Sequence, residues 1–120
     1  MFQNFQYAYT FKDTTIYGGL LAQEFIFSYR DYNLGVDVSW NRDEELKVTH
    51  ELFKNTQRLD LIWNNIVSMT SDSTRIIRSF NLTITFNPTD IIFIDGRVNL
   101  SLVKIDNKWQ IIHWLDESNF

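Results

Sequence analysis

The spacing of apolar residues changes once along this 120-residue chain, and that change constrains the fold more than any other feature. The first half carries helical spacing, and the residues on one helical face are Phe5, Ala8, Tyr9 and Ile16. From residue 58 onward, apolar and polar side chains alternate, which is the period of long strands with one face on a core. Because the helices precede the strands instead of alternating with them, the sequence predicts an α+β fold.

Two capping signals locate the starts of helices. Asp13 is placed to cap a second short helix that stops at or just beyond Gly18 and Gly19, and Asn41 with Glu44 three positions later has the capping-box spacing. We therefore expect a helix over residues 42–54. Its inward stripe is predicted as Leu46, Thr49, His50 and Phe53, and its outward residues as Glu44, Glu45 and Lys47.

The strands are predicted from β-forming residues and from alternation. Residues 25–29 favour a first strand, and residues 30–40 are expected to be a polar loop. The alternation over 59–63, 76–86 and 98–102 predicts antiparallel strands, and a polar turn at 106–108 leads into a last strand over 109–116.

The amino-acid composition limits which partners, metals and cofactors we expect. Apolar residues make up 44% and aromatic residues 16%, enough to bury a core in one domain over residues 1–120. The net charge of -4 opposes nucleic acid as a partner. No cysteine and only two histidines are present, so we expect no metal site and no cofactor. No apolar run is long enough to be a transmembrane segment.

The order of elements resembles the NTF2-like (SnoaL or ketosteroid isomerase-like, cystatin-like cone) superfamily. The residues that carry this likeness are AYTFKD at 8–13, Tyr17 with Leu20 and Leu21, FIF at 25–27, and KWQIIHWLD at 108–116. The resemblance implies N-terminal helices packed into a curved antiparallel β-sheet. Within it, the chain looks like a branch of small bacterial proteins often carried as lipoproteins, which implies an exported, lipid-anchored domain without its leader, with a cytoplasmic location as the alternative.

The isomerase-like members of that superfamily carry an acidic base at the end of the first strand and a tyrosine in the first helix. In this sequence the corresponding positions hold Tyr29 and Phe5, so both roles are unfilled. Asp31 stands two residues after Tyr29 and would serve as the base only if the end of the strand were shifted.

Arg78 and His113 are the ionisable residues that strand alternation places on apolar faces. Arg78 shares a face with Ile76 and Phe80, where it would anchor an anion or stabilise an oxyanion; the alternative is a strand end or a structural ion pair. His113 is predicted on one side of its strand with Trp109 and Ile111, as a general base or as a packed sheet residue. His50, on the predicted inward stripe of the long helix, is a weaker candidate than His113 for a functional role.

Aromatic residues are the expected walls of a binding cavity, with simple core packing as the alternative. The predicted ligand-binding residues are Tyr9, Tyr29, Trp63, Arg78, Trp109 and His113. Trp114 is predicted on the opposite strand face from Trp109, where it would sit in a subunit interface.

Three functions follow from these residues. The leading one is binding of a small apolar or anionic ligand, or of a protein partner, in the concave sheet of a homodimer. The second is a cofactor-independent isomerase or dehydratase that uses His113 or Asp31 as base and Arg78 as oxyanion stabiliser. The third is a pure oligomerisation module with a filled cavity. An enzyme needs converging ionisable groups in an open cavity, and a binder needs only the cavity.

Overall fold

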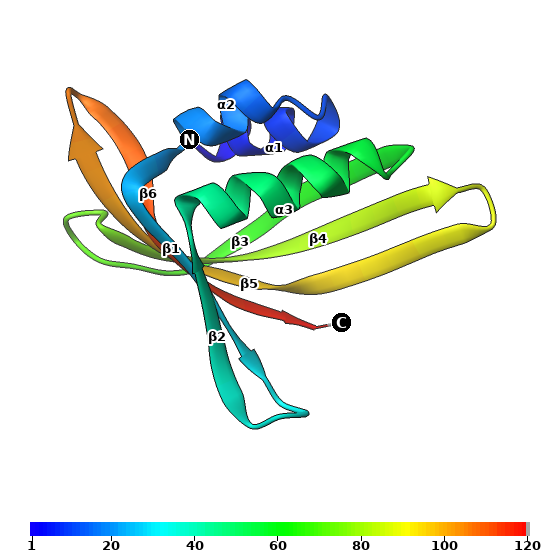
Figure 1. The fold of residues 1–120 in the computed structure, drawn as a ribbon. Helices are drawn as coiled ribbons and strands as arrows, with labels where there is room; N and C mark the ends of the chain where they lie inside the picture. The colour runs from blue at the N-terminus through cyan, green and yellow to red at the C-terminus, as the bar shows by residue number, and fades with distance from the viewer. Residues whose placement is uncertain (120) are drawn as a thin grey trace.

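Helices occupy the N-terminal part of the chain and one later segment, and long strands make up most of the rest (Figure 1). The computed structural model describes residues 1–119, and the side chains of residues 1–117. The helices are α1 (Phe2–Thr10), α2 (Thr14–Gly19) and α3 (Arg42–Lys54). The strands are β1 (Leu21–Asp31), β2 (Val36–Asn41), β3 (Arg58–Met69), β4 (Arg75–Asn87), β5 (Asp90–Ile105) and β6 (Lys108–Asn119).

The six strands form one curved sheet in the order β2-β1-β6-β5-β4-β3, and the three helices lie on one face of it (Figure 1). The predicted α+β fold is confirmed. All neighbouring strands are antiparallel except β1 and β6, which pair in parallel, so the sheet is mixed. This parallel pair brings the first strand of the chain beside the last, with β2 alone on the outer side of β1.

The predicted caps begin both later helices. The Asp13 carboxylate accepts a hydrogen bond from the backbone N–H of Ile16 at 3.0 Å, and the Asn41 side-chain oxygen accepts one from Glu44 N–H at 3.0 Å. Arg42 then donates to the backbone oxygen of Gly18 at 2.9 Å, which ties the start of α3 to the end of α2.

The prediction that residues 30–40 form a loop is wrong. They contain β2, which pairs with β1 to make a hairpin. Asp31 organises the turn, because its carboxylate accepts hydrogen bonds from the backbone N–H groups of Asn33 and Leu34 at 3.0 and 3.1 Å. Gly35 completes the turn with a φ of +68°, a conformation that glycine adopts without strain. The strand β2 is short and mostly exposed, so its sequence shows little of the apolar–polar alternation that predicts a strand.

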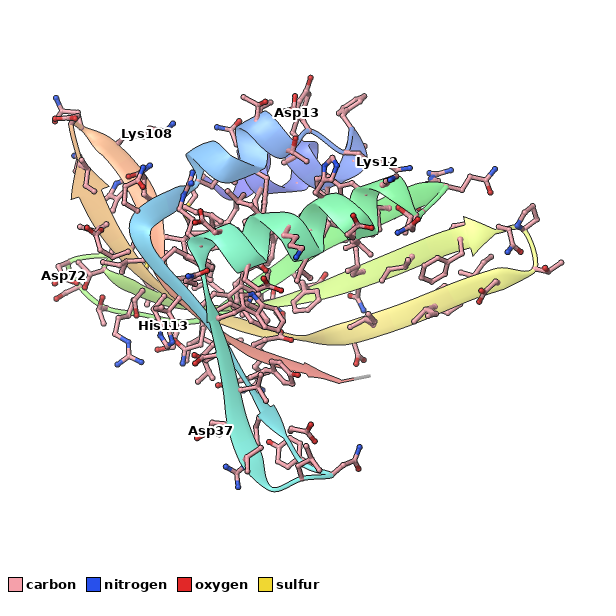
Figure 2. The ribbon with its side chains drawn as sticks, in the orientation of Figure 1. Lys12, Asp13, Asp37, Asp72, Lys108 and His113 are labelled. Atoms are coloured by element: carbon pink, nitrogen blue, oxygen red, sulfur yellow. The ribbon has the colours of Figure 1, made fainter. Side chains whose placement is uncertain are left out.

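A β-bulge in β6 reverses the predicted faces of His113 and Trp114. Leu102 of β5 pairs with Ile111, but Ser101 pairs with His113, so Ile112 is the extra residue. An extra residue shifts every later side chain to the other face of the sheet. Trp114 therefore packs in the core, only 8% exposed, and His113 lies on the side of the sheet away from the helices (Figure 2). The predicted subunit-interface position of Trp114 is wrong for the same reason.

The core fills the space between the helices and the sheet. Its fully buried large side chains include Phe5, Tyr17, Phe25, Leu59, Leu100 and Ile111. Two hydrogen bonds fix α1 on β3, from the Gln6 side chain to the Leu61 carbonyl and from Trp63 Nε1 to the Phe2 carbonyl.

The buried stripe of α3 differs from the predicted one. Glu45, Thr49 and Phe53 are buried and Leu52 is half-buried, whereas His50 is exposed. The helix is rotated so that Glu45, predicted outward, faces the sheet, and the predicted inward position of His50 is wrong.

We expect Asn41→Ala to lower the free energy of unfolding by about 1 kcal/mol, because it removes an N-cap hydrogen bond of α3. Urea denaturation followed by circular dichroism measures the change. Asn33→Ala, in the exposed β1–β2 turn, is the matched control and should change stability by less than about 0.5 kcal/mol. Equal losses in the two variants would contradict a capping role for Asn41.

Candidate functional site

A cavity of about 230 Å³ lies between the helices and the concave face of the sheet. Its walls are mainly apolar, and its aromatic members are Phe5, Tyr9, Phe27, Trp40, Trp63, Phe80 and Trp114. The aliphatic members are Val48, Leu52, Leu61, Leu82, Ile84, Ile94 and Val98. Thr49 and two carboxyl groups, Glu45 and Asp116, are the polar residues that line it, and no lysine, arginine or histidine does so among the described side chains.

Three aromatic rings form a row across one end of the cavity. Phe27 of β1 pairs with Trp40 of β2 on one side and with Trp114 of β6 on the other. The Phe27 ring stacks on Trp40 with a centroid separation of 4.7 Å and meets Trp114 edge-on at 5.2 Å. Cross-strand contacts of this kind hold aromatic side chains in fixed orientations. The row is therefore a rigid wall.

Glu45 brings a carboxyl group to the cavity from the helical layer. Its side chain is only 4% exposed, and Tyr17 donates a hydrogen bond to Oε2 at 3.4 Å. Burial, with a smaller contribution from Asp116, raises the pKa of Glu45 from an ordinary 4.5 to about 7, although hydrogen bonds from Trp40 and Tyr17 oppose the rise. Near neutral pH this carboxyl group therefore exists in both protonation states, as a general base or acid requires.

Two buried tyrosines stand beside Glu45. Burial raises the pKa of Tyr9 above its ordinary value, with smaller contributions from Glu45 and Asp116, and burial likewise raises the pKa of Tyr17. Both hydroxyl groups therefore stay protonated and act as hydrogen-bond donors. Edge-to-face packing of the Tyr9 and Tyr17 rings, 5.8 Å apart, fixes them under α3.

Two of the predicted ligand-binding residues line the cavity. Tyr9 is 7% exposed at the end of α1, and Trp63 of β3 packs edge-on against Phe5 at 5.2 Å. Tyr29 lies just outside it, with its ring 5.8 Å from Trp40, and it lines a separate surface cleft along the β1–β2 hairpin.

Arg78 is on the predicted face of β4, but it does not line the cavity. Its Nε donates to the carbonyl oxygen of Asn64 at 3.1 Å, and its guanidinium lies 4.7 Å from the centroid of the Phe2 ring and 5.8 Å from that of Trp63. The side chain thus covers the outside of the aromatic wall, and its charge is compensated by cation–π contacts.

The structure separates the other candidate residues from the cavity. His113 is hydrogen-bonded to Ser28 Oγ at 3.2 Å on the outer face of the sheet, and Asp31 belongs to the β1–β2 turn. Trp109 is half-buried near the opposite end of β6, with Lys104 Nζ 5.7 Å from its ring centroid. The three candidate catalytic residues, His113 or Asp31 as the base and Arg78 as the oxyanion stabiliser, do not converge.

Sequence reasoning missed both carboxyl groups of the cavity. The acidic first turn predicts Glu45 on the solvent face, although Glu45 stands four residues before Thr49 and eight before Phe53, which is the spacing of one helical stripe. Asp116 stands two residues after Trp114, and the bulge that turns Trp114 inward brings both to the cavity. Nothing in the local sequence marks that bulge.

Among the described residues, no three histidine, aspartate or glutamate side chains come close enough to hold a metal ion. No helix in the described part of the chain has the length and hydropathy needed to cross a membrane.

The fold is that of the NTF2-like proteins. A candidate scytalone dehydratase from Novosphingobium aromaticivorans superposes with a TM-score of 0.82 at 14% identity, covering 100% of this chain and 79% of that one. An NTF2-like protein of unknown function from an Exiguobacterium species gives 0.70 at 10% identity, with coverages of 98% and 97%.

A candidate aromatic ring hydroxylase from Novosphingobium aromaticivorans gives a TM-score of 0.75 at 9% identity, covering 97% of this chain and 82% of that one. No family model and no curated protein matches the sequence. Structural likeness at such low identity establishes the fold, and one fold of this kind serves many functions.

The raised pKa of Glu45 predicts a specific pH dependence of stability. The folded state holds this proton more tightly than the unfolded state, so the contribution of Glu45 is most favourable below about pH 4.5 and is lost as the pH rises to about 7. We expect the loss to be on the order of 2 to 3 kcal/mol.

Glu45→Gln keeps the size of the side chain and cannot ionise, so it should remove this pH-dependent loss. Urea denaturation of both proteins at pH 5 and pH 8 gives the comparison, and all other titrating groups are shared. Parallel pH profiles for the two proteins would show that Glu45 titrates normally.

Proposed function

We propose that this protein binds a small, neutral and mainly apolar molecule in the cavity between its helices and its sheet. The observation that carries the proposal is the cavity itself, which is walled by seven aromatic side chains. A dry apolar cavity of about 150 Å³ is enough to bind benzene, so one of about 230 Å³ suits a ring system with one or two further groups.

The charge of the lining selects a neutral ligand over an anionic one. An anion that entered this mainly apolar cavity would lose its hydration, and the Glu45 carboxylate would repel it. Arg78, expected to anchor an anion, is engaged outside the wall. The proposal therefore keeps the apolar ligand of the sequence-based prediction and leaves out the anionic one.

Tetralin, a bicyclic hydrocarbon, is a suitable first probe. We expect saturation-transfer NMR to detect its binding to the wild-type protein and a Val48→Phe variant to weaken that binding at least tenfold, because Val48 lines the cavity and is 40% exposed at its edge. Val67→Phe, on β3 and outside the cavity, is the matched control. Equal binding by both variants, or none by the wild type, would contradict the proposal.

A second candidate function is proton transfer at carbon, as in an isomerase or dehydratase without a cofactor. The observation that favours it is Glu45, a buried cavity carboxyl group with a pKa near 7 and a tyrosine hydrogen bond. Glu45 would be the general base, a role that the sequence-based prediction gives to His113 or Asp31. A base of this kind would accept a proton from a carbon next to a carbonyl group.

The ketone 1-tetralone tests this second function. In D₂O, the wild-type protein should accelerate exchange of the hydrogens on the carbon next to its carbonyl group, as the Glu45 carboxylate accepts a proton and solvent deuterium replaces it. Glu45→Gln should lower the exchange rate at least a hundredfold, in the range typical of a lost general base. Exchange unaffected by the substitution would exclude Glu45 as the base.

The remaining expectations stay predictions. A homodimer is supported by exposed apolar side chains on the outer face of the sheet, among them Ile62 of β3 and Phe93 of β5, and analytical ultracentrifugation measures it. The sequence also predicts a protein partner, one domain over residues 1–120, and an exported or cytoplasmic location. The open cavity and the buried Trp114 support ligand binding over a pure oligomerisation module.

A further inference from the structure

The Glu45 carboxyl group is held in the cavity wall by hydrogen-bond donors from two other elements. Tyr17 of α2 donates to Oε2 at 3.4 Å, and the Trp40 side chain of β2 also donates to the carboxyl group. Both donors are held by packing, because the Trp40 ring stacks on Phe27 with a centroid separation of 4.7 Å and Tyr17 is completely buried. The carboxyl group therefore has a fixed place in the wall of the cavity.

The two protein donors leave part of the hydrogen-bonding capacity of Glu45 unused. An ionised carboxylate only accepts hydrogen bonds, and its two oxygen atoms offer about four lone-pair sites. Tyr17 and Trp40 occupy two of these sites, and Glu45 lines the cavity, so further lone pairs remain for a bound molecule. In apolar surroundings, such an acceptor is stabilised most by a partner that donates a hydrogen bond.

The ionisable groups that face Glu45 come from three elements. They are Tyr9 of α1, Tyr17 of α2 and Asp116 of β6. The pKa values of both tyrosines are raised, so neither changes its charge near neutral pH, whereas the Glu45 carboxyl group does. A hydrogen bond to the charged carboxylate favours that form, so a ligand that donates one should bind more tightly as the pH rises. A hydrocarbon should show no such gain.

We propose that the ligand of this cavity carries an O–H or N–H group that donates a hydrogen bond to the Glu45 carboxylate, while the aromatic walls cover the rest of the molecule. This inference rests on the proposed binding function and narrows its ligand class to neutral, mainly apolar compounds with a hydrogen-bond donor. A ligand with only a carbonyl or ether oxygen does not meet this requirement, because an ionised carboxylate has no proton to donate to it.

Affinities for indole and indene at pH 8 test the inference. These bicyclic compounds have the same frame, and the N–H group of indole, which only donates, replaces a CH₂ group of indene. The ratio of the indene to the indole dissociation constant should be about tenfold larger in the wild-type protein than in Glu45→Leu, which lacks the acceptor. Glu44→Leu, at the exposed preceding position of α3 and outside the cavity, is the matched control and should keep the wild-type ratio.

A second measurement on the wild-type protein covers the case in which Glu45→Leu fails to fold. The same ratio should rise at least about threefold from pH 5 to pH 8, as the carboxyl group ionises, and the N–H proton signal of bound indole should move downfield in NMR spectra.

Two results would overturn the inference and leave the proposed cavity intact. One is binding of both compounds with the same ratio in the wild-type protein and Glu45→Leu, and the other is a wild-type ratio that does not change with pH. Failure of both compounds to bind the wild-type protein would instead overturn the proposed function.

Discussion

The packing of Phe5 joins the helical layer to the sheet, and the rest of the structure depends on it. The ring is 1% exposed and contacts Tyr17 of α2, Trp63 of β3 and Trp114 of β6, with centroid separations of 5.6, 5.2 and 5.4 Å. One side chain thus links elements that are more than a hundred residues apart in the chain. Truncating such an aromatic residue typically costs about 3 to 5 kcal/mol, a large part of the stability of a small domain.

The same aromatic contacts shape the cavity. Phe5 and Trp63 line it from one side and the row of Trp40, Phe27 and Trp114 from another, so the residues that stabilise the fold also define the binding site. Rings held by edge-to-face contacts cannot easily turn to fill the space between them. The rigid walls leave Glu45 in a fixed position, and a ligand would find its carboxyl group already oriented.

Burial gives the cavity its chemistry. Glu45 on the surface of α3 would be an ordinary helix-capping acid, but under the helix its charged form loses hydration and its pKa rises to about 7. His113 shows the opposite case: it lies on the outer face of the sheet, where it bonds Ser28, and it does not line the cavity. The identity of an ionisable residue therefore says less about function than the face on which it lies.

The sequence by itself determined the α+β fold, the caps at Asp13 and Asn41, and the face of Tyr9 and Trp63, because periodicity and capping are local properties read within a few residues. The tertiary structure alone decided the parallel pairing of β1 with β6, the rotation of α3 that buries Glu45, and the bulge that exchanges the faces of His113 and Trp114. These features depend on contacts between distant segments. A one-residue shift in register reverses every side chain that follows it, and no local pattern records such a shift.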